Sequence, residues 1–149
     1  MNTYNTSLNQ VPGIVKTYKN ELDNKTVLNF GSGKGWKKTE DFLNKSTVYH
    51  YDINDPKFNE LPLKKFDKVI CANVLNVIDT AYEIQQVVNR CITLTSTSGQ
   101  IYFSIYQGDK SGVGSATAKG YQRNEKTIAY EKYFKNIIRK NNYLIYTKS

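Results

Sequence analysis

Thr26–Trp36 reads TVLNFGSGKGW, and this segment is the strongest indication of fold class in the sequence. Its first five residues form a short apolar run with β-branched members, a pattern typical of a buried parallel strand. Glycines then occupy alternate positions, at Gly31, Gly33 and Gly35. They suit a turn from strand to helix in which the backbone must approach a ligand closely. The stretch therefore indicates a ligand-binding turn at the carboxyl end of a strand.

A carboxylate at a matching distance strengthens this interpretation. Asp52 ends the next strand pattern and lies 21 residues beyond Gly31, close to the roughly 20 that separate a glycine turn from a ribose-binding acid in dinucleotide-type folds. The glycine spacing alone is less specific. A nicotinamide turn would need a glycine in place of Trp36, and no Lys-Ser/Thr pair follows as in a P-loop. For the glycines by themselves, a tight connection in an ordinary α/β domain is an equal alternative, and Asp52 favours the ligand site.

Length and composition bound the class of protein. The 149 residues, 39% of them hydrophobic, predict one globular domain over residues 1–149. No apolar run approaches the ~18 residues of a membrane span, and the first residues lack the layout of a signal peptide. Cys71 and Cys91 lie in apolar segments without a CxxC pair, so we expect reduced thiols in a cytoplasmic protein. One histidine and two separate cysteines make a metal site an unattractive hypothesis.

The positive charge is concentrated in the last third of the chain. The formal net charge is +8, and residues 119–149 carry eight basic and two acidic side chains. Such a segment can attract nucleic acid, which makes nucleic acid a candidate partner. A solvated basic surface is the alternative, and we favour it slightly.

Strand patterns alternate with helix patterns along the chain, which predicts a compact Rossmann-like α/β fold: a mainly parallel sheet with helices on both faces. Between Asp52 and Phe66 the chain is too short for a further helix and strand, so we expect a trimmed architecture. A long polar loop is expected over Gln107–Lys126. The expected strands are Thr26–Phe30, Thr47–Tyr51, Phe66–Ala72, Gln100–Tyr106 and Tyr143–Tyr146. The expected helices are Ile14–Leu22, one ending near Asn44, one from Thr80 to Ser98, and one over Tyr130–Ile138.

Together these motifs resemble class I S-adenosylmethionine-dependent methyltransferases. The resemblance rests on NFGSGKG at Asn29–Gly35, on Asp52, and on FDKVICANVL at Phe66–Leu75. More narrowly, NVLNV at Asn73–Val77 and KGYQRN at Lys119–Asn124 look like motifs of a small group of methyltransferase-domain proteins of bacteria and their phages. The resemblance extends from about Thr6 to Tyr146, over nearly the whole chain.

The resemblance implies S-adenosylmethionine as cofactor and assigns residues to it. The glycine turn would hold the methionine part, Asp52 the ribose hydroxyls, and the residues after Asp52 the adenine. The implied cofactor-binding residues are Asn29, Gly31, Ser32, Gly33, Gly35, Asp52, Ile53, Asn54, Asn73 and Val74. Asn29 departs from the pattern, because an acidic residue usually stands there; an amide oxygen can still accept one hydrogen bond.

On the acceptor side, the long loop carries Lys119, Gln122 and Arg123, and we expect them to face the methyl acceptor. Gln122 and Arg123 are the candidate catalytic residues, since a guanidinium grips anionic groups with two hydrogen bonds. Solvated side chains in a loop that approaches a helix are the alternative. Asn76 is read chiefly as a strand terminator.

The predicted function is therefore methyl transfer from S-adenosylmethionine to an unidentified acceptor. Known motifs of base methylation are missing, because NVLN is not a Pro-Pro-Tyr type signature and no Pro-Cys pair occurs. One alternative is a protein that binds or sequesters the cofactor without transferring its methyl group. The other is a basic nucleic-acid-binding protein built on a methyltransferase fold.

Overall fold

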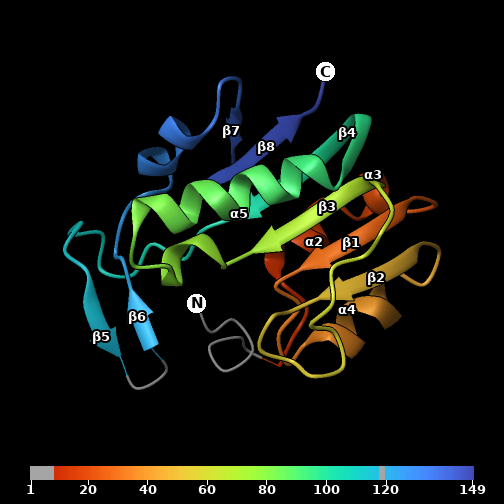
Figure 1. Cartoon of the computed structure of the whole chain (residues 1–149), viewed down its shortest axis with the longest axis horizontal. Helices are drawn as coiled ribbons and strands as arrows, with labels where there is room; N and C mark the ends of the chain where they lie inside the picture. Colours follow the sequence, from red (N-terminus) through yellow and green to blue (C-terminus); the bar gives the residue numbers. More distant parts are fainter. Residues whose placement is uncertain (1–8, 118–119) are drawn as a thin grey trace.

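The computed structural model describes residues 9–117 and 120–149, and Figure 1 shows a sheet flanked by helices. In this described part, the main sheet has six strands in the order β2-β1-β3-β4-β8-β7. Strands β2, β1, β3 and β4 are parallel, β8 is antiparallel to β4, and β7 is antiparallel to β8. The strands are β1 Thr26–Phe30, β2 Thr47–Tyr51, β3 Phe66–Ala72, β4 Thr95–Ser104, β7 Ile138–Lys140 and β8 Tyr143–Thr147. The predicted α/β fold with a mainly parallel sheet is confirmed.

Helices cover both faces of the sheet, as predicted. The α-helices are α2 Gly13–Thr17, α3 Lys19–Leu22, α4 Trp36–Phe42 and α5 Ala81–Thr93, and the short 3₁₀ helices are η1 Leu75–Val77 and η2 Thr127–Tyr133. Successive residues of a strand face opposite sides. Val69 and Cys71 of β3 are buried in the core with α5, whereas Ile70 is buried in a second core with α2 and α3. No helix in the described ranges has the length and apolar character needed to cross a membrane.

Helix α5 begins as the sequence predicts and ends earlier. The Thr80 hydroxyl accepts a hydrogen bond from the backbone N–H of Glu83 at 3.2 Å, which caps the first turn. The prediction that the helix continues to Ser98 is wrong, because it ends at Thr93 and β4 begins at Thr95. Thr95 is buried and pairs with Phe66 of β3, so this segment, which includes β-branched threonines, joins the strand instead of extending the helix.

Two further helix predictions are also wrong. The expected helix Ile14–Leu22 is divided at Tyr18, whose φ of −106° and ψ of 23° are not helical. The expected helix Tyr130–Ile138 is a 3₁₀ turn followed by extended chain, and its last residue belongs to β7. Tyr130 and Tyr133 are buried in the main core, so one-sided packing produced a helical spacing without an α-helix.

The trimmed connection is confirmed, since residues 52–65 contain no helix or strand. The loop expected over Gln107–Lys126 instead includes two short antiparallel strands, β5 Ser115–Thr117 and β6 Gly120–Gln122. Figure 1 shows this pair standing apart from the main sheet, on the side toward which β1 and β3 point. The pair therefore lies near the edge where the sequence places its candidate site.

Candidate functional site

A cavity of about 470 Å³ opens at the carboxyl ends of β1 and β3. Its walls come from these strand ends, from η1, from the β5–β6 pair and from the segment before α2. Among the described residues that line it, none has a charged side chain. The lining residues are Gln10, Pro12, Asn29, Gly31, Ser32, Ala72, Asn73, Asn76, Val77, Tyr106, Thr117, Tyr121 and Gln122.

The glycine turn forms one wall of this cavity. Gly31 and Gly33 have φ values of 75° and 63°, in the left-handed region that glycine adopts without steric cost. The backbone N–H groups of Gly31 and Ser32 both donate to the carbonyl oxygen of Tyr51, at 2.6 and 3.1 Å, which ties the turn to β2. The hydroxyl of Ser32 is buried at the cavity wall without a hydrogen-bond partner in the described structure. It can therefore bind a ligand.

Asp52 supports the glycine turn and does not line the cavity. Its side chain is fully buried, and its Oδ2 accepts the Gly33 N–H at 2.9 Å while its Oδ1 accepts the Asn54 N–H at 3.0 Å. The carboxylate thus closes the turn against the end of β2. In this arrangement its oxygens serve backbone groups, and contact with a ribose would require them to accept further bonds or to exchange partners.

The other residues assigned to the cofactor divide into two groups. Asn29, Gly31, Ser32 and Asn73 line the cavity. The side chain of Asn73 accepts the Ser104 hydroxyl at 3.3 Å, and its backbone is left-handed with φ 58°. The remaining positions lie outside the lining: Gly33 and Asp52 in the closed turn, Gly35 before α4, exposed Ile53, Asn54 beside Asp52, and Val74 buried in the core. For both groups of residues, cofactor binding stays a prediction.

A buried histidine orients Asn29. Nδ2 of Asn29 lies 3.3 Å from Nδ1 of His50, and Nε2 of His50 lies 3.1 Å from Oε1 of Glu40. An amide nitrogen can only donate, so Nδ1 accepts and the neutral ring carries its proton on Nε2, which donates to Glu40. The amide oxygen of Asn29 is then left as an acceptor at the cavity wall. This role of His50 was not predicted from the sequence, because its partners Asn29 and Glu40 lie 21 and 10 residues away in the chain.

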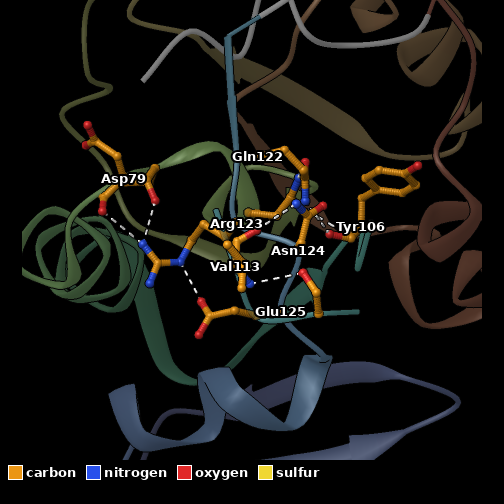
Figure 2. Close-up of polar contacts among 10 residues, drawn as sticks. Asp79, Tyr106, Val113, Gln122, Arg123, Asn124 and Glu125 are labelled. Carbon is orange, nitrogen blue, oxygen red and sulfur yellow. Dashed lines mark hydrogen bonds and ion pairs between the residues drawn. The ribbon is translucent and has the colours of Figure 1, made fainter. Parts of the chain in front are cut away.

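A hydrogen bond between Asn76 and Gln122 connects the NVLNV and KGYQRN motifs. Nδ2 of Asn76 donates to Oε1 of Gln122 at 3.1 Å, and Nε2 of Gln122 donates to the carbonyl oxygen of Tyr106 at 3.1 Å. Oδ1 of Asn76 in turn accepts the Tyr106 N–H at 3.4 Å. Figure 2 shows Gln122 beside Tyr106. Both amides are buried at the cavity wall, so Asn76 is more than a strand terminator.

Arg123, which was expected to face the methyl acceptor, does not line the cavity. Its Nε bonds Glu125 at 2.5 Å, and its Nη1 donates to the carbonyl oxygens of Ile78 and Asp79 at 3.0 and 3.1 Å (Figure 2). The guanidinium is held by a neighbouring carboxylate and by the chain that follows η1, because these groups satisfy its donors in a half-buried position. It fastens the β5–β6 pair to the body of the protein.

Asn124 also links this segment to the preceding loop and to β5. Lys119, the third residue expected to face the acceptor, lies outside the described residues. Nδ2 of Asn124 donates to the Val113 carbonyl at 3.0 Å and to the Ser115 hydroxyl at 3.2 Å. Figure 2 shows Gln122, Arg123 and Asn124 reaching different parts of the chain from one short segment. The segment that resembled a functional motif is thus largely a structural clasp, and Gln122 alone among these three lines the cavity.

Comparison with known proteins identifies the fold. No protein-family model matches the chain, and no curated protein matches it in sequence. Among solved structures, the didemethyltoxoflavin N-methyltransferase of Burkholderia thailandensis, crystallised with its namesake compound and S-adenosylhomocysteine, matches with a TM-score of 0.66 at 17% identity, over 91% of this chain and 77% of that one. An S-adenosylmethionine-dependent methyltransferase of Clostridium acetobutylicum matches with a TM-score of 0.64 at 16% identity, over 90% and 87%. The N-methyltransferase NodS of Bradyrhizobium japonicum, in complex with S-adenosylhomocysteine, matches with 0.56 at 11% identity, over 97% and 96%. This chain has a methyltransferase fold.

The cavity lies where this methyltransferase fold is expected to bind ligands. Strand order reverses between β1 and β3, because β2 follows β1 on one side and β3 lies on the other. Open α/β sheets bind ligands outside the carboxyl ends of the strands at such a switch point. Tyr106 lines the cavity but was not singled out from the sequence, because it lies on an irregular segment without a pattern. Tyr121 belongs to the KGYQRN motif, yet no role was predicted for its side chain.

Proposed function

We propose that this protein binds S-adenosylmethionine and transfers its methyl group to an acceptor held in the same cavity. The observation that carries the proposal is the position of the cavity: it opens at the switch point between β1 and β3, beside a glycine turn, in a methyltransferase fold. The unpartnered hydroxyl of Ser32 fits a polar ligand there.

The cofactor would be held by the residues already assigned to it. The Asn29 amide oxygen would accept from the methionine ammonium, with Gly31, Ser32 and Asn73 beside the methionine part. Asp52 would receive the ribose hydroxyls after exchange of its backbone partners, with Ile53 and Asn54 near the adenine. The family resemblance supports all of these roles, and the cavity lining supports only those of Asn29, Gly31, Ser32 and Asn73.

Methyl transfer places modest demands on the protein. The sulfonium cofactor supplies an activated methyl carbon, which bonds to a nucleophilic atom of the acceptor while the carbon–sulfur pair stays on sulfur and the acceptor releases its proton. The chain's task is to hold the acceptor in line and to exclude water. The described lining residues include no carboxylate, imidazole, amine or thiol that would serve as a general base.

That composition also favours the second candidate, a protein that binds the cofactor without transferring the methyl group. An acceptor that must lose its proton before attack would find little help in such a cavity. The two candidates differ in one product, since only transfer releases S-adenosylhomocysteine. Nucleic-acid binding by the basic C-terminal third is a weaker candidate than either of these. Arg123 and Arg139 pair with glutamates, and Lys148 donates to backbone carbonyls near the end of α5.

Calorimetry with S-adenosylmethionine tests the proposal directly. We expect saturable binding of S-adenosylmethionine and S-adenosylhomocysteine, and much weaker binding of ATP, which shares the adenosine but lacks the methionine part. Incubation with candidate acceptors should then release S-adenosylhomocysteine. Folded protein that binds neither sulfur compound would overturn the proposal, and binding without product would favour the second candidate.

A further inference from the structure

The half of the cavity away from the glycine turn has its own chemical character. We call it the acceptor wall: Asn76, Val77, Tyr106, Tyr121 and Gln122. These residues come from η1, from the chain after β4 and from β6, and none of them belongs to the glycine turn. If the cofactor occupies the turn side, this wall faces the second substrate.

The described part of the acceptor wall carries no charge. Its residues have amide, phenol or aliphatic side chains. Arg123, which follows Gln122 in the sequence, is held by Glu125 and by backbone carbonyls. Transfer of a charged group from water into such a cavity is strongly unfavourable unless an opposite charge compensates it. The wall therefore disfavours an anionic or cationic substrate.

Two fixed amides on this wall keep unused donors. Asn76 and Gln122 are 2% and 8% exposed, and each amide nitrogen makes one of the contacts described above. Each nitrogen has two hydrogens, so each keeps one more donor that no other described residue accepts. Because both side chains are locked by bonds to one another and to Tyr106, these donors are held in place for an acceptor atom of the ligand. A ring carbonyl oxygen satisfies such donors without introducing charge.

Two tyrosines complete the wall. The Tyr106 side chain is 61% exposed. Tyr121 packs so closely on Gly114 that a Cβ at that glycine would collide with its phenol ring. An exposed ring and a ring held by close packing offer flat faces to a ligand. Flat faces favour a planar aromatic partner, whose stacking on an aromatic side chain is worth ~1–3 kcal/mol per ring.

We propose that the methyl acceptor is an uncharged, planar heterocycle with ring carbonyl oxygens, taken up as a free small molecule. The inference rests on the proposed function and names the substrate class of the same cavity. A free molecule is favoured over a base within a nucleic acid, because the described wall has no cation for a phosphate.

A matched set of small probes tests the substrate class. Uracil carries the planar ring and the carbonyls, orotate adds a carboxylate to the same ring, and dihydrouracil keeps the carbonyls without the aromatic plane; lumazine is the fused-ring version of uracil. Binding is measured by ligand-observed NMR and calorimetry, with and without S-adenosylhomocysteine. We expect uracil and lumazine to bind, and orotate and dihydrouracil to bind at least about fivefold more weakly. A short oligouridylate should bind no better than uracil.

Variants locate the probes on the wall. Tyr106→Leu should weaken lumazine binding by about fivefold to a hundredfold. The matched control is Tyr82→Leu, since Tyr82 is also exposed, at 71%, but lies on α5 away from the cavity. Equal effects of the two changes, tighter binding of orotate than of uracil, or preference for the oligonucleotide would each overturn the inference.

Failure of this inference is distinguishable from failure of the proposed function. Binding of S-adenosylmethionine is measured separately, in the absence of any probe. Protein that binds the cofactor but none of the neutral probes contradicts the substrate class alone. Protein that binds lumazine at the Tyr106 wall but not the cofactor contradicts methyl transfer and leaves a binding site for neutral heterocycles.

Discussion

The amide nitrogen of Asn29 donates a hydrogen bond to Nδ1 of His50, and this contact decides which end of the amide faces the cavity. The resemblance expects an acidic residue in this position. Here a neutral side chain presents an oxygen because the histidine behind it, bonded to Glu40, accepts from its nitrogen. The arrangement works only while the imidazole is neutral, since a protonated ring would offer an N–H to the amide nitrogen.

Stability should therefore fall when the solution is acidified. Burial lowers the pKa of His50 below its ordinary value of 6.5, against the opposing influence of Glu40 and of Asp55. A lowered folded-state pKa means that the unfolded chain binds the proton first. This contribution to stability is complete above pH 6.5 and is lost as the pH falls from there through the folded-state pKa. Denaturant unfolding between pH 5 and 8 (roughly the range of histidine titration) measures it.

The control for this prediction is His50→Gln, which keeps hydrogen-bonding capacity without titration. His50 is the single histidine of the chain, so its ring proton resonance reports its titration directly. We expect a smaller pH dependence of stability and of S-adenosylmethionine affinity in the variant than in the wild type. A His50 pKa above that of a free imidazole would contradict the assignment.

Asp52→Ala should both destabilise the fold and weaken cofactor binding. The change leaves the N–H groups of Gly33 and Asn54 without their carboxylate acceptor, and an unpaired buried donor costs about 1–3 kcal/mol. Urea unfolding and calorimetry give the two effects. Asp41→Ala is the control, since that carboxylate is exposed and pairs only with Lys37 among the described contacts, so about 0.5 kcal/mol or less is expected.

Strands β1, β2, β3, β4 and β8 were predictable from the sequence, whereas β5, β6, β7 and the contacts of Arg123 were not. Within β3, Val69–Cys71 is an unbroken apolar run because this part of the strand is buried on both faces, and such a run can be recognised without knowing its partners. The segment Tyr130–Ile138 was wrongly predicted as a helix because Tyr130, Tyr133, Phe134 and Ile137 all pack on the same core, and this one-sided packing imitates helical spacing. The roles of Asn76 and Arg123 depend on partners distant in sequence, at Gln122 and at the chain after η1. No local pattern encodes such a meeting.

Arg123→Ala should destabilise the protein while leaving the affinity of the folded protein for S-adenosylmethionine within a few tenths of a kcal/mol, the range of a change at an uninvolved position. The guanidinium holds Glu125 and two backbone carbonyls, and we expect its loss to cost about 1.5–3 kcal/mol. Arg139→Ala is the matched control, because Arg139 also pairs with a glutamate but is 44% exposed, and about 0.5 kcal/mol or less is expected there. Similar losses for the two arginines would show that Arg123 does not act as a clasp.

The final prediction separates backbone strain from ligand contact at the glycine turn. Gly33 and Gly112 both have left-handed backbones, with φ of 63° and 78°, so an alanine at either position should cost about 1–2 kcal/mol of stability. Gly112 has open space around the position of a Cβ and does not line the cavity. Gly33 donates to Asp52 inside the turn that we assign to the cofactor. We therefore expect comparable losses in denaturant unfolding for Gly33→Ala and Gly112→Ala, but a loss of S-adenosylmethionine affinity of tenfold or more, about 1.4 kcal/mol, only for Gly33→Ala. If calorimetry finds the same affinity for both variants, the turn is a structural connection and the cofactor lies elsewhere.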